Sequence, residues 1–204
     1  GKSLLDVDIA FLLSKLCPDS GFATYDGPGF WGVAHPDVTA NVFISLPNSQ
    51  QNSIKQQIID YTISSRSEDG TWPSYWWRTC HYSTLMNLEM LTLLGIRDEF
   101  QLPVVQNDET HAIHSDFDLA CVTGIAALHK TGGLAVNSLV ETLMFKQKND
   151  GAWLGDENLR VTHPDCKQPW LQTQGQRYSD SVGLITTATA VRALVLSIKG
   201  TSQQ

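Results

Sequence analysis

The feature that most constrains this chain is a glycine turn that recurs before helices that are apolar on nearly every side. Residues 69–72 read Asp-Gly-Thr-Trp, residues 149–153 read Asn-Asp-Gly-Ala-Trp, and residues 20–22, Ser-Gly-Phe, form a degenerate copy. In each copy a helix with one polar side precedes the turn, and an aromatic loop leads from the turn to the apolar helix. The pattern predicts one structural unit used several times, in which neighbouring units bury one another's apolar faces.

Hydrophobic periodicity separates the expected helices into two sets. Helices with one polar side are expected over residues 4–16, 53–65 and 134–147. Helices that are apolar nearly all round are expected over residues 37–46, 83–94, 116–128 and 181–198. The second set belongs on the inside of a two-layered structure, buried on both sides, and no convincing strand is predicted.

Composition and charge exclude several classes of protein. A hydrophobic fraction of 42% with 17% charged residues is that of a folded globule. The formal net charge is −7 and no cluster of Lys or Arg is present, so nucleic acid is not an expected partner. No apolar stretch reaches the roughly 20 residues that span a bilayer, and the first residues do not read as a signal peptide. We therefore expect a cytoplasmic protein with no membrane span, whose four scattered cysteines stay reduced.

Residues 147–153, Gln-Lys-Asn-Asp-Gly-Ala-Trp, resemble the QW repeat of the superfamily of terpenoid (squalene) cyclases and protein prenyltransferase β-subunits, and residues 67–72 are a weaker copy. The resemblance covers most of the chain and implies an all-α fold, the α/α toroid, with two concentric layers of helices. We expect residues 1–204 to form a single domain of this kind, an incomplete toroid of about four helical-hairpin repeats. Such a ring stays open, closes against a second copy in a homodimer, or belongs to a larger parent chain. The resemblance implies that Trp72 and Trp153 hold neighbouring helices together.

Residues 116–121, Asp-Phe-Asp-Leu-Ala-Cys, resemble the Asp-x-Asp-Asp-Thr-Ala acid motif of class II terpenoid cyclases, with Leu119 replacing one carboxylate. The resemblance implies that Asp118, supported by Asp116, protonates an alkene or an epoxide. Burial and like-charge repulsion would raise the pKa of one carboxyl until it keeps its proton at neutral pH. His81 is predicted to tune or reprotonate this acid. Helix capping is the alternative interpretation of these aspartates, and it applies also to Asp37, a further carboxyl at the start of an apolar helix.

Aromatic residues are concentrated in the three loops that enter apolar helices, so they are expected on one rim of the molecule. Rings that face inward can hold an apolar ligand and stabilise a passing cation. The predicted substrate-binding residues are Trp31, Trp77, Tyr82 and Tyr178, with Arg78 available to grip an anionic group. Surface ion pairing is the alternative role of Arg78.

The predicted function is that of a small terpenoid-cyclase-like enzyme, a cyclase or isomerase that uses buried carboxylic acids on a largely apolar small molecule. No cofactor is expected. A zinc site at His111, His114 and Asp116 is a less favoured possibility, and it would make the protein a metal-assisted hydrolase. The other alternative is a non-catalytic module that binds a small molecule or a peptide in the same cavity.

Overall fold

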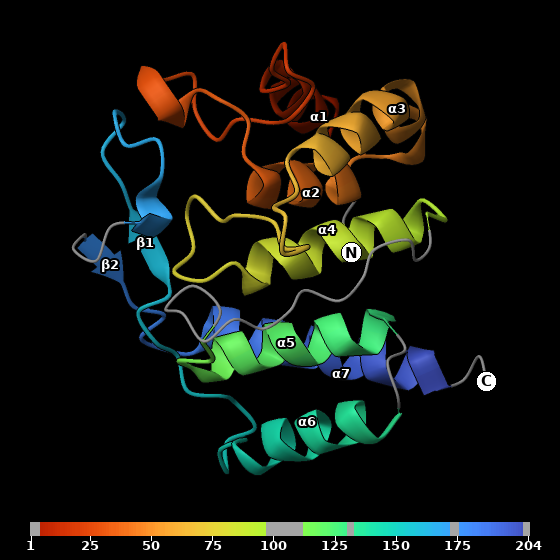
Figure 1. The fold of residues 1–204 in the computed structure, drawn as a ribbon, viewed down its shortest axis with the longest axis vertical. Coiled ribbons are helices and arrows are strands. Elements are labelled where there is room, and N and C mark those ends of the chain that lie inside the picture. The colour runs from red at the N-terminus through yellow and green to blue at the C-terminus, as the bar shows by residue number, and fades with distance from the viewer. Residues whose placement is uncertain (1–4, 97–111, 130–132, 172–175, 202–204) are drawn as a thin grey trace.

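The computed structural model describes residues 5–96, 112–129, 133–171 and 176–201, and this part of the chain is mostly helical (Figure 1). The α-helices are α1 (Asp6–Ser14), α2 (Pro36–Ser45), α3 (Asn48–Ser64), α4 (His81–Leu93), α5 (Asp116–His129), α6 (Gly133–Phe145) and α7 (Leu184–Thr201). Two short 3-10 helices, η1 (Gly29–Trp31) and η2 (Pro169–Leu171), lie in the connecting loops. The predicted helical fold class is confirmed, and each predicted helix overlaps an observed one.

Four helices form a row in which each contacts the next: α2 packs on α4, α4 on α5, and α5 most extensively on α7. Helix α3 packs on α2, while α6 packs on α5 and more lightly on α7. The four helices of the row run in the same direction, whereas α3 and α6 run back (Figure 1). The N-terminal ends of α2, α4, α5 and α7 therefore lie on the same side of the molecule, where the long connecting loops gather.

The three turns that share a sequence pattern also share a backbone geometry. The residue at the turn has a positive φ in each case: 73° at Ser20, 88° at Gly70 and 85° at Gly151. The backbone N–H of Ser67 donates to the carbonyl of Thr71 (2.9 Å), and equivalent bonds of 2.8 Å join residues 17 to 21 and 148 to 152. Glycine favours this conformation because it has no Cβ, and Ser20 adopts it without that advantage.

The aromatic residue after each turn joins the preceding helix to the following one. Trp72 is fully buried, and its indole Nε1–H donates to the carbonyl of Thr62 on α3 (2.7 Å). Its backbone N–H donates to the hydroxyl of Thr84 on α4 (3.2 Å). Trp153 repeats this arrangement, with Nε1–H donating to Leu143 on α6 (2.7 Å) and the backbone N–H donating to Thr187 on α7 (3.1 Å). Both tryptophans thus act as clasps between helices, as the sequence indicated.

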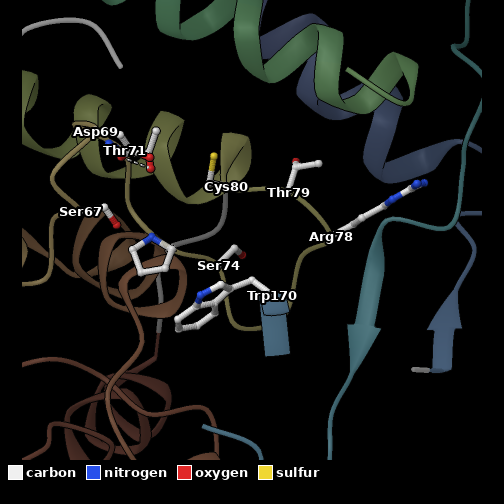
Figure 2. Close-up of a pocket in the computed structure, with 9 residues that line it drawn as sticks. Ser67, Asp69, Thr71, Ser74, Arg78, Thr79, Cys80 and Trp170 are labelled. Carbon is white, nitrogen blue, oxygen red and sulfur yellow. Dashed lines mark hydrogen bonds between the residues drawn. The ribbon is translucent and has the colours of Figure 1, made fainter. Parts of the chain in front are cut away.

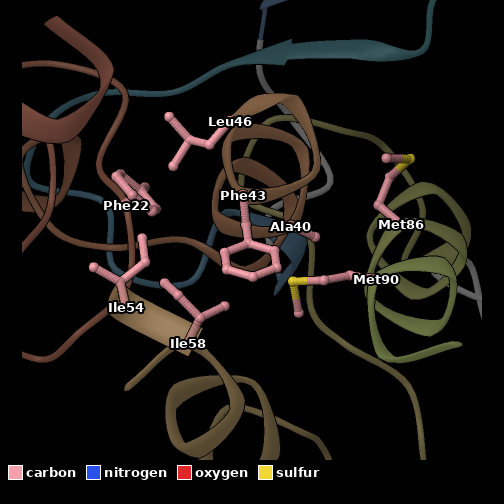
Figure 3. Packing of buried hydrophobic residues seen from close by; sticks show 8 residues of the cluster. All are labelled: Phe22, Ala40, Phe43, Leu46, Ile54, Ile58, Met86 and Met90. Atoms are coloured by element: carbon pink, nitrogen blue, oxygen red, sulfur yellow. The ribbon is translucent and has the colours of Figure 1, made fainter. Parts of the chain in front are cut away.

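Each of these aromatic residues belongs to one of three buried apolar clusters along the row. Phe22 belongs to the first, which fills the space between α2, α3 and α4 (Figure 3). Trp72 packs in the second, between α4 and α5, and Trp153 packs in the third, between α5, α6 and α7. The fold is therefore a series of similar modules, each with a clasp residue in its core.

Two features differ from the sequence predictions. The segment between Trp153 and α7 contains a short antiparallel ribbon, β1 (Leu159–Val161) paired with β2 (Gln176–Tyr178), where only a loop was expected. The expectation that residues 181–198 are buried on both sides was also wrong. Helix α7 is the last of the row, so Leu184 and Ile198 on its outer side are 71% and 65% exposed.

Among the described helices, none combines the length and apolarity that crossing a membrane requires.

Candidate functional site

The N-terminal ends of the row of helices hold several buried titratable side chains. His35 and Asp37 lie at the start of α2, His81 is the first residue of α4, and Asp116 and Asp118 lie in the first turn of α5. All five side chains are buried. The surrounding loops supply their hydrogen-bond partners and most of the nearby aromatic rings.

The side chain of Asp118 has protein hydrogen-bond donors at both of its oxygens. Its side chain is 1% exposed, and its Oδ1 accepts a hydrogen bond from the hydroxyl of Thr79 (2.7 Å). Its Oδ2 accepts from the backbone N–H of His114 (3.0 Å) and the hydroxyl of Ser115 (3.1 Å). Because both oxygens accept bonds from protein donors, this carboxyl ties α5 to the loop that precedes α4.

Asp116 differs from Asp118 in its partners, because it pairs with a lysine, and in its position beside an open cavity. Its Oδ1 is 3.0 Å from Nζ of Lys146, and its Oδ2 accepts from the backbone N–H of Leu154 (3.3 Å). Asp116 also lines an open cavity of about 360 Å³ together with His114 and Lys146. The cationic partner suits a structural carboxylate better than a proton donor.

The residues described do not bring together three or more potential metal ligands. His111, one of the three residues named for a possible zinc site, lies outside the described residues. His114 and Asp116 do line one cavity, but Asp116 is paired with Lys146. His81 is buried two residues after Thr79, the residue that bonds to Asp118, and its role as a tuning partner stays a prediction.

The predicted aromatic wall is divided between two clusters. In the first, the rings of Trp77 and Phe117 stack with centroids 4.9 Å apart, and Tyr82 lies 4.5 Å from Trp77. Trp77, Phe117 and Tyr178 also line a small, mostly apolar cavity of about 60 Å³ together with Ile185 at the start of α7. This cluster lies between the loop before α4, the β-ribbon and the row of helices.

The second cluster surrounds the start of α2. Trp31 lies 5.7 Å from Tyr25 and 6.2 Å from Trp76, and its Nε1–H donates to the hydroxyl of Thr162 (3.3 Å). Trp76 in turn contacts Tyr75 with ring centroids 5.0 Å apart. Of the predicted binding residues, Trp31 therefore belongs to the second cluster, whereas Trp77, Tyr82 and Tyr178 belong to the first.

A cavity of about 140 Å³, lined by both polar and apolar side chains, lies beside the loop that precedes α4 (Figure 2). Ser74 and Thr79 both line it, and so does Trp170 from η2. Arg78 is also a lining residue, but Figure 2 shows its side chain extending away from Ser74 and Trp170. The backbone of Arg78 is held by Asn158 and by the guanidinium of Arg160, each at 2.9 Å.

The most distinctive carboxyl in the rim is Asp37, which the sequence analysis noted at the start of an apolar helix but did not name among the catalytic residues. It is 2% exposed, and its Oδ2 accepts hydrogen bonds from the hydroxyl of Ser74 (2.9 Å) and the backbone N–H of Trp76 (3.1 Å). Its Oδ1 is buried and has no hydrogen-bond partner in the described part of the chain. Burial raises the pKa of Asp37 above its ordinary value, against the opposing influence of His35 and the hydrogen bonds.

A sequence signal for Asp37 was present. Residues 35–40 read His-Pro-Asp-Val-Thr-Ala and keep the middle Asp and the Thr-Ala of the acid motif, with His35 and Val38 at the other two carboxylate positions. The segment at 116–121 keeps only the first and middle Asp of the motif's five defined positions, because Ala120 and Cys121 stand where the motif has Thr and Ala. The hydroxyl of Thr39, the motif residue after Val38, accepts a hydrogen bond from the backbone N–H of Phe22 (2.8 Å), the aromatic residue that follows the first turn.

The architecture and the buried rim define the chain as having the fold of the type II terpene cyclases. It matches the apo structure of the type II terpene cyclase MstE from Scytonema with a TM-score of 0.73 and 21% identity, over 94% of this chain and 67% of that one. An MstE variant in complex with geranylgeranyl dihydroxybenzoate, its substrate, gives a TM-score of 0.73 and 21% identity over 95% of this chain and 66% of that one.

A protein from Actinoplanes gives a TM-score of 0.76 and 20% identity, over 94% of this chain and 68% of that one. The chain spans 65% of the length of MstE in its complex with the product merosterolic acid A. Neither a protein-family model nor a curated protein sequence matches this chain. The resemblance noted in the sequence is thus confirmed at the level of the fold.

Proposed function

We propose that this protein is a terpenoid-cyclase-like enzyme that starts cyclisation or isomerisation by protonating a largely apolar small molecule, and that Asp37 is the proton donor. The observation that carries the proposal is the state of the Asp37 carboxyl: it is buried, one oxygen accepts two hydrogen bonds, and the other has no partner in the described part of the chain.

A general acid must hold its proton at the working pH and release it at the substrate. The raised pKa of Asp37 favours the first requirement. Because Oδ2 already accepts bonds from Ser74 and Trp76, the proton is best placed on Oδ1. The same two donors stabilise the carboxylate that remains after the proton has left, so they favour the transfer itself.

The aromatic rings near the start of α2 fit the next stage of such a reaction. Protonation of an alkene leaves a carbocation, which is attracted to the faces of Trp and Tyr rings. Tyr75 and Trp76 contact the ring of His35, and Trp31 lies beside Trp76. In this proposal Trp77, Tyr82 and Tyr178 form a second apolar wall for the rest of the molecule.

Asp118 is the second carboxyl to test for the acid role, as the sequence resemblance implied. Its network with Thr79, His114 and Ser115 supports a positioning role, because it holds the loop that also carries Ser74 and Trp76. A pair of variants, Asp37→Asn and Asp118→Asn, separates the two assignments.

The substrate of MstE, geranylgeranyl dihydroxybenzoate, is a suitable probe because its chain offers alkenes to a proton donor. Protonation of an alkene forms a C–H bond, so the cyclised product made in D2O should carry one deuterium at the protonated carbon. We expect the unchanged protein to form this product and Asp37→Asn to form it at least about 10²-fold more slowly. Binding of this probe without any product would favour the non-catalytic module, and full turnover by Asp37→Asn would remove Asp37 from the mechanism.

A further inference from the structure

Asn158, the residue before β1, is a buried amide with one end that has no partner. It is 4% exposed, and its Oδ1 accepts a hydrogen bond from the hydroxyl of Ser115 (3.1 Å), whose proton Oδ2 of Asp118 shares. Its Nδ2 is buried and has no hydrogen-bond partner in the described part of the chain. Buried amide groups in folded proteins are normally hydrogen-bonded, so this donor suits an acceptor that the described residues do not supply.

The position of Asn158 is fixed by the backbone on both sides. Its own N–H donates to the carbonyl of Asp156, and its carbonyl accepts from the backbone N–H of Arg78, each at 2.9 Å. The backbone N–H of Arg160 donates to the carbonyl of Trp76 (2.6 Å), so residues 158–160 are paired with the loop before α4. The amide is therefore held in place before any ligand binds, which lowers the entropic cost of binding.

Asn158 lines the small, mostly apolar cavity of about 60 Å³ that lies between this loop, the β-ribbon and α7. The stacked rings of Trp77 and Phe117 contribute to its wall, as do Tyr178 and Ile185. Sites for small molecules are typically lined by apolar and aromatic side chains, with a few placed polar groups that orient the ligand. A fixed amide donor among aromatic rings has this composition.

The other polar side chains at the cavity have their own partners or face water. Oδ2 of Asp180 accepts hydrogen bonds from the backbone N–H (2.8 Å) and the hydroxyl (2.9 Å) of Thr186. Oδ1 of Asp156 accepts from the backbone N–H of Glu157 (2.7 Å), and Ser179 is exposed. Among the described residues that line this cavity, Nδ2 of Asn158 is thus the buried donor that remains for a ligand.

We propose that this cavity is a binding subsite, in which Nδ2 of Asn158 donates a hydrogen bond to an acceptor oxygen on an otherwise apolar molecule. The ligand class is therefore an oxygenated chain, such as a prenyl alcohol or ether, rather than a pure hydrocarbon. A cavity of about 60 Å³ has roughly twice the volume share of one water molecule, so only the oxygen-bearing part enters it. That this ligand is the substrate rests on the proposed function.

The contact with the proposed acid runs through one hydroxyl. The hydroxyl of Ser74 accepts a hydrogen bond from the backbone N–H of Trp77 (3.2 Å) and donates one to Oδ2 of Asp37 (2.9 Å). The aromatic wall of the subsite and the acid are therefore held by the same loop. In this proposal Asn158 fixes the oxygen-bearing end of the substrate, and the remaining chain extends from the cavity.

The test compares two probes that differ only at the oxygen: the methyl ether of geranylgeraniol, and the hydrocarbon in which a CH2 group replaces the ether oxygen. Both bind to the full chain and to Asn158→Leu, each also carrying Asp37→Asn so that the proposed acid converts neither probe. Quenching of Trp fluorescence gives the dissociation constants. The cost of removing each probe from water is common to both proteins, so it cancels when the two Kd ratios are compared.

We expect the preference for the ether over the hydrocarbon to fall about three- to tenfold in Asn158→Leu, the usual value of one net hydrogen bond. An unchanged preference would overturn the inference, because the amide would then contact no oxygen of the ligand. A preference that rises in Asn158→Leu would overturn it too, since the amide would then present its oxygen to the cavity.

Two further variants separate the donor from the shape and the fold of the site. Ile185→Ala removes apolar wall from the same cavity and should weaken both probes alike, so an equal change of preference in this variant would contradict the role of the donor. Asn158→Asp keeps an oxygen for Ser115 and replaces Nδ2 with an acceptor. It should also lose the preference for the ether, and it keeps the test valid if circular dichroism shows that Asn158→Leu is unfolded.

Binding is independent of turnover, so failure of the proposed function is distinguishable from failure of this inference. If the preference falls as expected but the protein with Asp37 intact forms no product from geranylgeranyl dihydroxybenzoate, the subsite stands and the protein is a binding module. If product forms and the preference is unchanged in Asn158→Leu, the enzyme stands and Asn158 has only a structural role.

Discussion

Asp37 and Asp118 are two carboxyls in nearly the same situation, each buried in the first turn of a helix in the central row. They differ in how their oxygens are used. Asp118 accepts hydrogen bonds on both oxygens from three donors, whereas Asp37 accepts two on Oδ2 and leaves Oδ1 without a partner in the described part of the chain.

This difference shows that burial alone does not make a carboxyl into a proton donor. Hydrogen bonds to both oxygens satisfy a buried carboxyl and hold it in place. A carboxyl with one unpartnered oxygen keeps a place for a proton at that oxygen. Asp118 therefore suits a structural carboxylate and Asp37 suits an acid, and exchanging each carboxyl for an amide should affect different properties.

The largest expected effect concerns turnover and stability in the two matched variants. Asp37→Asn should lower kcat by about 10²- to 10⁴-fold, the usual contribution of a general acid, while the protein stays about as stable. Asp118→Asn should cost about 2–3 kcal/mol of stability, because the amide NH2 cannot accept the bonds that the carboxylate accepts. Turnover with geranylgeranyl dihydroxybenzoate and urea unfolding measure the two effects. The reverse pattern would assign the acid to Asp118.

The next effect concerns the anchoring of the Asp37 region through Gly29. This residue has a φ of 61°, and a Cβ there would overlap the carbonyl oxygen of Pro164. Gly95 has a φ of 73°, and a Cβ there would meet no atom within 4 Å, so it is a matched control for the backbone strain alone.

Gly95→Ala should cost about 1 kcal/mol for the left-handed backbone. Gly29→Ala should cost about 1–3 kcal/mol more, because the overlap displaces the loop that holds Phe30. Urea unfolding measures both, and equal costs would show that the contact with Pro164 is easily relaxed.

A smaller effect is expected in the pH dependence of stability. Because the folded pKa of Asp37 is raised, the folded state binds more protons than the unfolded state above about pH 3.9, the ordinary value for Asp. The contribution of Asp37 to the free energy of unfolding is therefore fully present below about pH 3.9, and it is lost as the pH rises through the pKa of Asp37 in the folded state. His35, with a lowered pKa, acts in the opposite sense up to about pH 6.5.

Urea unfolding of the unchanged protein and of Asp37→Asn at several pH values isolates the contribution of Asp37. The variant should become relatively more stable as the pH rises above about 4, since it has no carboxyl to ionise. A constant difference across the whole pH range would show that Asp37 titrates normally.

The fold was largely predictable because its signals are local and repeated. Glycine with positive φ, a buried indole and an apolar helix recur in order, and each element predicts its own geometry. The β1–β2 ribbon was not predictable in this way, since three-residue strands are too short to show an alternating pattern. The exposed side of α7 was not predictable either, because apolar composition does not tell which helix ends a row.

The site was less predictable because its chemistry depends on contacts between distant segments. The sequence places Asp37 and Asp118 in similar motif fragments, and the segment with two aspartates was the more conspicuous one. Only the fold shows that Ser74 reaches Asp37 while Thr79 reaches Asp118. The two carboxyls differ in how many donors reach each oxygen, and the path of the loop before α4 determines this difference.

The smallest effects concern the side chains of Ser74 and Thr79, which lie on the same loop and line the same cavity. Ser74→Ala removes one of the two donors to Asp37, so the carboxylate left after proton transfer is less stabilised. We expect kcat to fall by about tenfold, with the Asp37 titration displaced to higher pH. Thr79→Ala removes one of three donors to Asp118 and should cost about 1 kcal/mol of stability with little change in kcat. If Thr79→Ala instead lowers kcat more than Ser74→Ala does, the loop serves Asp118 in catalysis, and the contrast between the two carboxyls is reversed.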